Sequence, residues 1–253
     1  MDWIYEIPGK TLLDVANLAG TVVEDVVLQV QKDGMLLTAV DASHVAMFAI
    51  TIGEFDADKE ILKFGVELRN LVDIINGHTK ATKSQTDIVQ LEYDKTTSKL
   101  KVRAGDTVME QLPSLDITTM LAAPKIPDLS ECGMVEADGV CPKKFAAALK
   151  KQARFGYLAT FVLNEGGLDI TTDSGATGLI TTHLDATVKD EATSSFSLTY
   201  LKPFSDRVKN AAKLTVETGN AAPLVAKWQH DGINDNPGFE VTYFLAPRIE
   251  SDY

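Results

Sequence analysis

Two stretches of the chain repeat the same series of predicted elements, and this repetition constrains the fold more than any other feature. Each copy has a proline before a helical pattern, followed by two apolar strand patterns joined by a glycine turn. The first copy places the helix at 11–19 and the strands at 26–31 and 35–40. The second places the helix at 142–154 and the strands at 158–163 and 168–171. This spacing predicts a tandem duplication of one α+β unit.

A proline-rich stretch, Pro113 to Leu129, lies between the copies. It holds three of the nine prolines and no glycine. Because prolines lack a backbone donor and favour extended neighbours, we predict an exposed extended connector. The predicted organisation is an N-terminal domain at 1–113, a connector at 114–129 and a C-terminal domain at 130–253. The apolar connector residues either pin it to a sheet or serve a function.

Composition and charge bound the class of protein. The chain has 253 residues, 45% of them hydrophobic and 24% charged, as in ordinary globular proteins. It has no long apolar run and no secretory leader pattern, which predicts an intracellular protein. The formal net charge of −12 would by itself argue against a nucleic-acid partner. The distribution of charge decides, however, because one basic stripe on an acidic protein can still bind DNA.

The two cysteines, Cys132 and Cys141, form no CxxC motif and have no companion histidine motif. This spacing predicts two buried thiols rather than a disulfide framework or a zinc site. The sequence therefore predicts no metal and no cofactor.

Basic side chains gather on the predicted helices. In the helix at 142–154 they lie opposite the apolar face, and no Asp or Glu interrupts them. Such a face is either merely solvated or turned toward phosphates, and we favour the second. A helix at 68–76, ended by Gly77, and a helix at 200–212 add further cations. The candidate residues are Lys80, Lys83, Lys143, Lys144, Lys150, Lys151, Arg154, Lys202, Lys209 and Lys213.

The segment from Asp41 to His44 places Asp, Ser and His together, which suggests a small hydrolase using Ser43 and His44. Neighbouring residues of an extended segment point to opposite faces, whereas a catalytic triad is assembled from separate parts of a fold. The sequence also lacks a G-x-S-x-G elbow, a P-loop and an H-E-x-x-H motif. The hydrolase is therefore a remote alternative.

Three short motifs resemble signatures of the proliferating cell nuclear antigen (PCNA) family, the DNA sliding clamps. They are Asp41-Ala-Ser-His44-Val45, Ile126-Pro127 and Leu245-Ala-Pro-Arg-Ile-Glu250. Together with the duplication, the resemblance covers essentially the whole chain. The ending is more similar to archaeal members than to animal ones.

The resemblance implies an α+β clamp fold, with two topologically similar domains that each carry antiparallel sheets outside and two short helices inside. Three subunits would join head to tail into a ring around duplex DNA. The implied function is that of a processivity factor, not an enzyme. It would be loaded by a clamp loader and would tether a replicative DNA polymerase, a flap endonuclease and a DNA ligase. A subunit of a heterotrimeric ring remains an alternative.

The resemblance also assigns surfaces. Strand 106–112 of one subunit would pair with about 177–184 of the next. Leu13, Asp14 and Gly20 stand where relatives often carry lysine, so the first copy should hold DNA less well. The pocket for the partners' short apolar motif would comprise His44, Val45, Met120, Leu121, Ile126, Pro127, Ala246, Pro247 and Ile249.

Overall fold

The computed structural model describes residues 3–82, 88–94, 96–104, 107–118, 120, 125–175, 178–232 and 238–248. The chain divides into two compact units. Unit 1 comprises Met1–Ala42, Phe48–Lys125 and Asp231–Phe239, and unit 2 comprises Ser43–Met47, Ile126–His230 and Glu240–Tyr253. Among the described helices, none is both long and apolar enough to cross a membrane.

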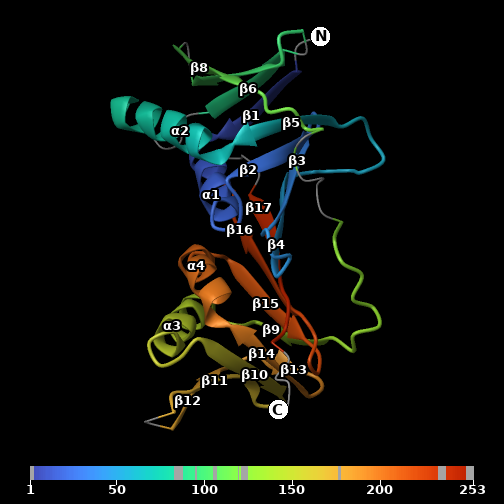
Figure 1. Ribbon diagram of the computed structural model, residues 1–253, viewed down its shortest axis with the longest axis vertical. Helices are drawn as coiled ribbons and strands as arrows, with labels where there is room; N and C mark the ends of the chain where they lie inside the picture. The colour runs from blue at the N-terminus through green and yellow to red at the C-terminus, as the bar shows by residue number, and fades with distance from the viewer. Residues whose placement is uncertain are drawn as a thin grey trace. The chain divides into compact units, whose positions relative to one another are not determined.

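The first copy of the repeat forms two antiparallel sheets and two helices (Figure 1). The strand orders are β1-β6-β7-β8 and β5-β2-β3-β4, and α1 packs against α2. In chain order the elements are β1 (Trp3–Pro8), α1 (Gly9–Ala19), β2 (Asp25–Val30), β3 (Gly34–Val40), β4 (Ala46–Gly53), β5 (Leu62–Glu67), α2 (Leu68–Thr82), β6 (Ile88–Asp94), β7 (Lys99–Ala104) and β8 (Thr107–Pro113).

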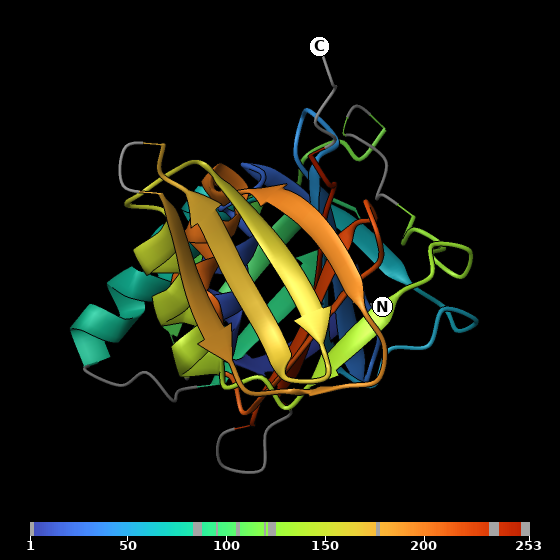
Figure 2. The ribbon, with the colours of Figure 1, turned by 90° about the horizontal axis from the view of Figure 1, so that it is seen from below.

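The second copy follows the same series with one extra short strand, β13. Its strand orders are β12-β11-β10-β14, drawn yellow to orange in Figure 2, and β13-β9-β15-β16-β17. The elements are β9 (Val135–Asp138), α3 (Pro142–Gln152), β10 (Leu158–Asn164), β11 (Gly167–Asp173), β12 (Leu179–Leu184), β13 (Thr187–Val188), β14 (Ala192–Ser197), α4 (Leu198–Val208), β15 (Lys213–Thr218), β16 (Leu224–His230) and β17 (Phe239–Leu245). Matching the two series element by element reproduces both strand orders, which confirms the predicted duplication.

A chain of aromatic rings forms the core of unit 2 and explains how its helices are fixed. Phe145 of α3 meets Phe161 of β10 edge to face, with centroids 6.3 Å apart. Phe204 of α4 stacks on Trp228 of β16 at 5.8 Å and contacts Tyr243 of β17 at 4.6 Å. Large buried rings of this kind dominate core energetics. The apolar faces of α3 and α4 are therefore held against both sheets, and their polar faces point outward.

Two predicted helix ends were wrong. Helix α2 continues through Gly77 to Thr82 instead of ending at Gly77, which has no positive φ and therefore keeps helical geometry. Helix α4 ends at Val208 rather than near 212, because the Ala212 N–H leaves the helix to donate to the Gln229 carbonyl at 2.8 Å.

Two further expectations need revision. Cys132 is half-buried and Cys141 is exposed, so the prediction of two buried thiols was wrong; both are free. Strand β1 was not predicted from the sequence, although its Tyr5 and Ile7 alternate as buried residues and the strand pairs with β6.

Candidate DNA-facing and partner-binding surfaces

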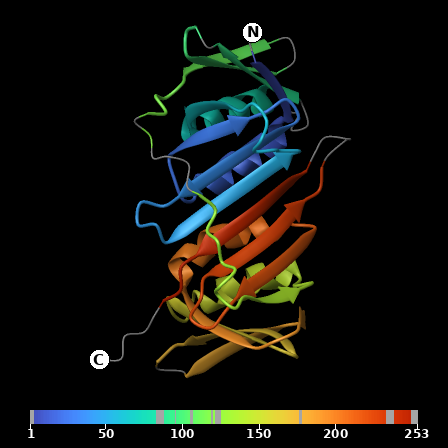
Figure 3. The same cartoon turned by 90° about the vertical axis from the view of Figure 1, so that its right-hand side faces the viewer.

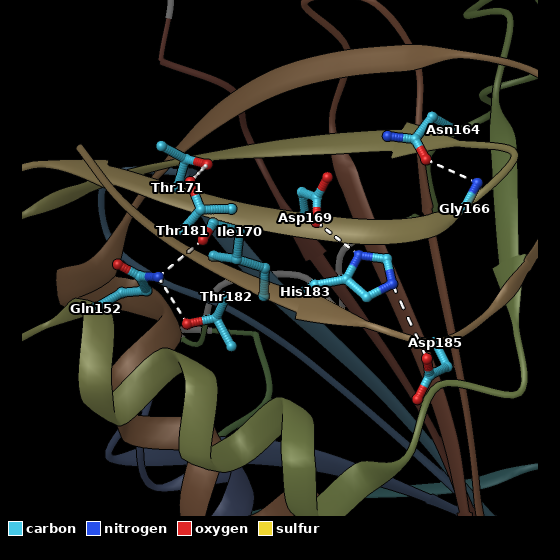
Figure 4. Close-up of polar contacts among 10 residues, drawn as sticks. All are labelled: Gln152, Asn164, Gly166, Asp169, Ile170, Thr171, Thr181, Thr182, His183 and Asp185. Carbon is cyan, nitrogen blue, oxygen red and sulfur yellow. Dashed lines mark hydrogen bonds and ion pairs between the residues drawn. The ribbon is translucent and has the colours of Figure 1, made fainter.

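Helix α3 presents the clearest basic face. Phe145, Ala146, Ala148, Leu149 and Gln152 are buried, whereas Lys143, Lys144 and Lys151 on the other side are exposed. The Gln152 side chain fixes the helix to the sheet. Its Nε2 donates to the Ile170 carbonyl at 2.8 Å and to Thr182 Oγ1 at 3.1 Å, which ties α3 to β11 and β12 (Figure 4). The lysines are therefore displayed from a rigid support.

Carboxylates from other elements lie against this basic face. Lys144 Nζ donates to Asp185 Oδ2 at 3.1 Å. Asp185 Oδ1 also lies 3.9 Å from His183 Nε2 (Figure 4). Asp206 of α4 pairs with Lys150 and lies 3.7 Å from Lys209 Nζ. Lys144 and Lys150 are therefore paired with acids in space, although the α3 sequence itself contains no Asp or Glu.

The two aspartates are held in their charged form. The hydrogen bond from Lys144 lowers the pKa of Asp185, and the hydrogen bond from Lys150 lowers the pKa of Asp206. Both carboxylates therefore remain negative through neutral pH. Asp185 was not predicted to belong to this surface, because it is distant from Lys144 along the chain.

The remaining predicted cations differ in position. Arg154 follows α3 and is exposed, Lys202 is exposed on α4, and Lys209 caps its C-terminal end. Lys80 lies within α2 rather than beyond it. Lys83 lies outside the described residues.

Lys213 lies on the opposite side of its sheet from the helices. Leu214 pairs with Trp228, whose ring stacks on Phe204 of α4, so these residues occupy the helix-facing side. Successive strand residues alternate between faces. Lys213 therefore occupies the outer face, where its Nζ lies 3.3 Å from Asp138 Oδ1. Figure 3 views this sheet, orange to red, from the side opposite α3 and α4.

Part of the predicted partner pocket is assembled in unit 2. The Ala246 N–H donates to the Val45 carbonyl at 2.8 Å, which joins two of the resemblance motifs that are distant in sequence. The Arg248 N–H donates to the Ser195 carbonyl at 2.7 Å and anchors the segment that contains Pro247. Ile126 and Pro127 are exposed in this unit, with Ile126 57% accessible.

The other pocket residues are placed separately or lie outside the described residues. Met120 belongs to unit 1 and is half-buried. Its Sδ would lie 2.3 Å from a Cβ placed on Gly65 of β5, so it occupies the space above that glycine. Leu121 and Ile249 lie outside the described residues.

The segment proposed for the hydrolase is a short turn. His44 is exposed and has a φ of 55°, a left-handed conformation that is uncommon for residues other than glycine. Ser43 is also exposed. The turn thus presents both side chains at the surface next to Val45. Among the described residues, no group of three or more His, Cys, Asp or Glu side chains is placed to hold a metal ion.

Several described strands lie at sheet edges, where a second chain could pair. Among them, β8 ends one sheet of unit 1 and β12 ends one sheet of unit 2. β12 carries Leu179, which is 72% exposed. Exposed edges with unpaired backbone groups readily accept another strand.

Curated relatives match nearly the whole chain. A protein named DNA polymerase sliding clamp from Methanosarcina mazei is 27% identical over 255 residues, which cover 97% of this chain and 98% of the relative. Proteins of the same name from Methanocella arvoryzae and Halobacterium salinarum are 28% and 27% identical, with the same coverage. No family profile matches the chain.

A solved structure matches the fold. The structure described as the C-terminal region of FEN-1 bound to A. fulgidus PCNA superposes with a TM-score of 0.83 and 24% identity, and the match covers 100% of both chains. The duplicated α+β units therefore define the DNA-clamp fold. The chain is similar over nearly its whole length to archaeal proteins named DNA polymerase sliding clamp.

Proposed function

We propose that this protein is a DNA polymerase processivity factor, a ring-shaped sliding clamp that encircles duplex DNA and tethers replication and repair enzymes. The near-full-length similarity to archaeal proteins named DNA polymerase sliding clamp carries this conclusion. The basic faces of α3 and α4 add a physical reason. A clamp that slides needs attraction to phosphates without base contacts, and exposed lysines on helices supply it.

We assign the DNA-facing role to the basic face of α3 and α4. It comprises Lys143, Lys144, Lys150, Lys151, Arg154, Lys202 and Lys209, and we add Lys80 and Lys83 from the first copy. Lys213 is left out, because its strand register places it on the opposite sheet face. The first copy carries Leu13, Asp14 and Gly20 on or beside α1, so it should contribute less positive potential.

Ring closure would use two of the edge strands, β8 and β12. β8 of one subunit would pair with β12 of the next, head to tail, and three subunits would close the ring. Pairing would also cover the exposed Leu179. The proposed domain boundaries, 1–113 and 130–253 with a connector at 114–129, place one such edge in each domain.

Partners would dock through the connector and the C-terminal segment. We propose a pocket that includes His44, Val45, Ile126, Ala246 and Pro247, and that takes the short apolar motif of a polymerase, flap endonuclease or DNA ligase. The Val45–Ala246 hydrogen bond supports this assignment because it joins the two motifs. A clamp loader would open the ring. We further propose that the protein has no catalytic activity of its own and works inside the cell with the genome.

A threading experiment tests encirclement without a clamp loader. A long duplex is fixed at one end, the protein is added, and the free end is then blocked with a bulky streptavidin. A clamp should stay on the DNA through a high-salt wash and be released when a nuclease cuts the duplex. Loss in the wash, regardless of the block, would mean that binding is electrostatic and not topological. Ser43→Ala should thread as well as the parent protein.

A further inference from the structure

Two lysines of the proposed DNA-facing surface, Lys150 and Lys209, share the carboxylate of Asp206. We propose that Asp206 is a built-in competitor of DNA phosphates, which occupies Lys150 and Lys209 until DNA displaces it. This inference rests on the proposed function. It assigns Asp206 the role of weakening DNA contact so that the clamp moves freely along the duplex.

The position of Asp206 makes this possible. It lies on α4, which packs against α3, and its Oδ1 pairs with Lys150 of α3 and lies 3.7 Å from Lys209 Nζ. All three side chains are about half exposed, at 42% for Lys150, 46% for Lys209 and 56% for Asp206. The carboxylate thus bridges two cations on the surface that would face DNA, where solvent and phosphates can reach all three groups.

The competition follows from the weakness of exposed ion pairs. Such a pair contributes little to stability, so a phosphate can replace the carboxylate at small cost. When a lysine exchanges Asp206 for a phosphate, the carboxylate must find a new counterion. Fewer counterions are then released overall than when an unpaired lysine binds DNA. Each contact is consequently weaker and less dependent on salt than the lysine count alone predicts.

A comparable exposed Asp–Lys pair on the other sheet face supplies a control. Asp138 pairs with Lys213 at 3.3 Å, but this pair lies on the face turned away from α3 and α4. The hydrogen bond from its lysine also lowers the pKa of Asp138. Asp206→Asn and Asp138→Asn therefore remove the same charge from similar surroundings, and only the first should affect DNA.

The experiment measures the affinity of each variant for a short linear duplex by fluorescence anisotropy over a range of salt concentrations. Asp206→Asn should bind about two- to five-fold more tightly at low salt. The plot of log K against log salt should steepen by about 0.9 for each lysine that gains a phosphate. Asp138→Asn should change neither quantity beyond the effect of one distant charge. A circular dichroism spectrum and melting curve check that each variant is folded.

A variant that lacks both lysines separates the competitor role of Asp206 from a general effect of net charge. In the Lys150→Gln/Lys209→Gln protein, adding Asp206→Asn should no longer raise affinity or slope. Equal effects of Asp206→Asn and Asp138→Asn, or an undiminished effect in the double-lysine background, would overturn the proposal. If the parent protein threads onto DNA but Asp206→Asn behaves identically, this inference alone fails. If the parent protein neither binds nor threads, the proposed function fails.

Discussion

Gly65 should control how the connector is attached to unit 1. The Leu115 N–H donates to the Gly65 carbonyl at 3.0 Å, and the two residues form an isolated antiparallel bridge at the edge of β5. A Cβ at position 65 would lie 2.3 Å from Met120 Sδ, 2.9 Å from Leu115 Cβ and 3.0 Å from the Leu115 carbonyl oxygen. These separations are too short for Gly65→Ala to fit without movement.

In Gly65→Ala, we expect the connector to be displaced and the sheet to keep its position. β5 is paired along its length with β2, where Gly65 lies opposite Val27, whereas the connector meets β5 through the isolated Gly65–Leu115 bridge and a 3.4 Å contact from Ser114 Oγ to the Gly65 carbonyl. The attachment should therefore lose about one net hydrogen bond, worth roughly 0.5–1.5 kcal/mol. Alanine also has less conformational freedom than glycine in the unfolded chain, which offsets this loss of stability by about 0.4–1 kcal/mol. The free energy of global unfolding should thus change by less than about 1 kcal/mol while the connector opens more often.

Amide hydrogen exchange measures this opening directly. Exchange at Leu115 should accelerate about two- to twelve-fold in Gly65→Ala, because that range corresponds to the loss of one hydrogen bond. Gly77→Ala is the matched control. Apart from its chain neighbours and the backbone of its own helix, no atom of the described residues lies within 4 Å of a Cβ at Gly77, so this change should stabilise α2 by about 1 kcal/mol without affecting Leu115. Met120→Ala combined with Gly65→Ala should restore only part of the protection, since the conflict with Leu115 remains.

Unchanged Leu115 exchange in Gly65→Ala would refute the reasoning, because the added methyl group would then fit without displacing the connector. A loss of several kcal/mol of global stability in Gly65→Ala would also refute the reasoning, because it would show that β5 is displaced and not the connector. If the proposed function is correct, Gly65→Ala should also lower the affinity for a peptide that carries a partner's apolar motif. This loss of affinity should accompany the faster amide exchange at Leu115.

Three other changes test the fold and the site. Phe204→Ala removes the ring that joins Trp228 to α4 and should cost about 3–5 kcal/mol of unfolding free energy in a denaturant titration; a cost below 1 kcal/mol would contradict its central packing. Burial, followed by the charge of Asp33, raises the pKa of Tyr5 from 10.0 to about 12. The contribution of Tyr5 to stability should therefore be constant below about pH 10 and fall by about 2–3 kcal/mol toward pH 12, and Tyr5→Phe should abolish that part of the loss. Lys144→Glu with Lys151→Glu should reduce the salt slope of DNA binding by about 0.9 per lost contact, and an unchanged slope would exclude both residues from the DNA surface.

The sequence predicted the repeat well because periodicity reports directly on burial. The helix at 142–154 and the strands around it combine regular apolar spacing with proline and glycine signals, and the structure places α3, β10 and β11 there. Gly77 was misjudged because a glycine ends a helix only when the chain adopts a left-handed turn. At Gly77 the helical conformation persists, and local sequence carries no signal for that choice.

The candidate site was only partly predictable, for a different reason. Which lysines lie on a helix follows from spacing, but which carboxylates approach them depends on tertiary packing. Asp185 meets Lys144 only because β12 is packed beside α3. For Lys213 the signal was present: the buried Leu214 next to it implies that Lys213 points to the opposite face. The joining of Val45 to Ala246 likewise required the fold.

Ring closure is the central claim, and the mass of the purified protein in solution tests it most directly. Light scattering over a dilution series should give a mass near three times the 27.4 kDa of one chain, with dissociation only at the lowest concentrations. A mass that stays at 27.4 kDa at every concentration would contradict a self-closing ring built from β8 and β12.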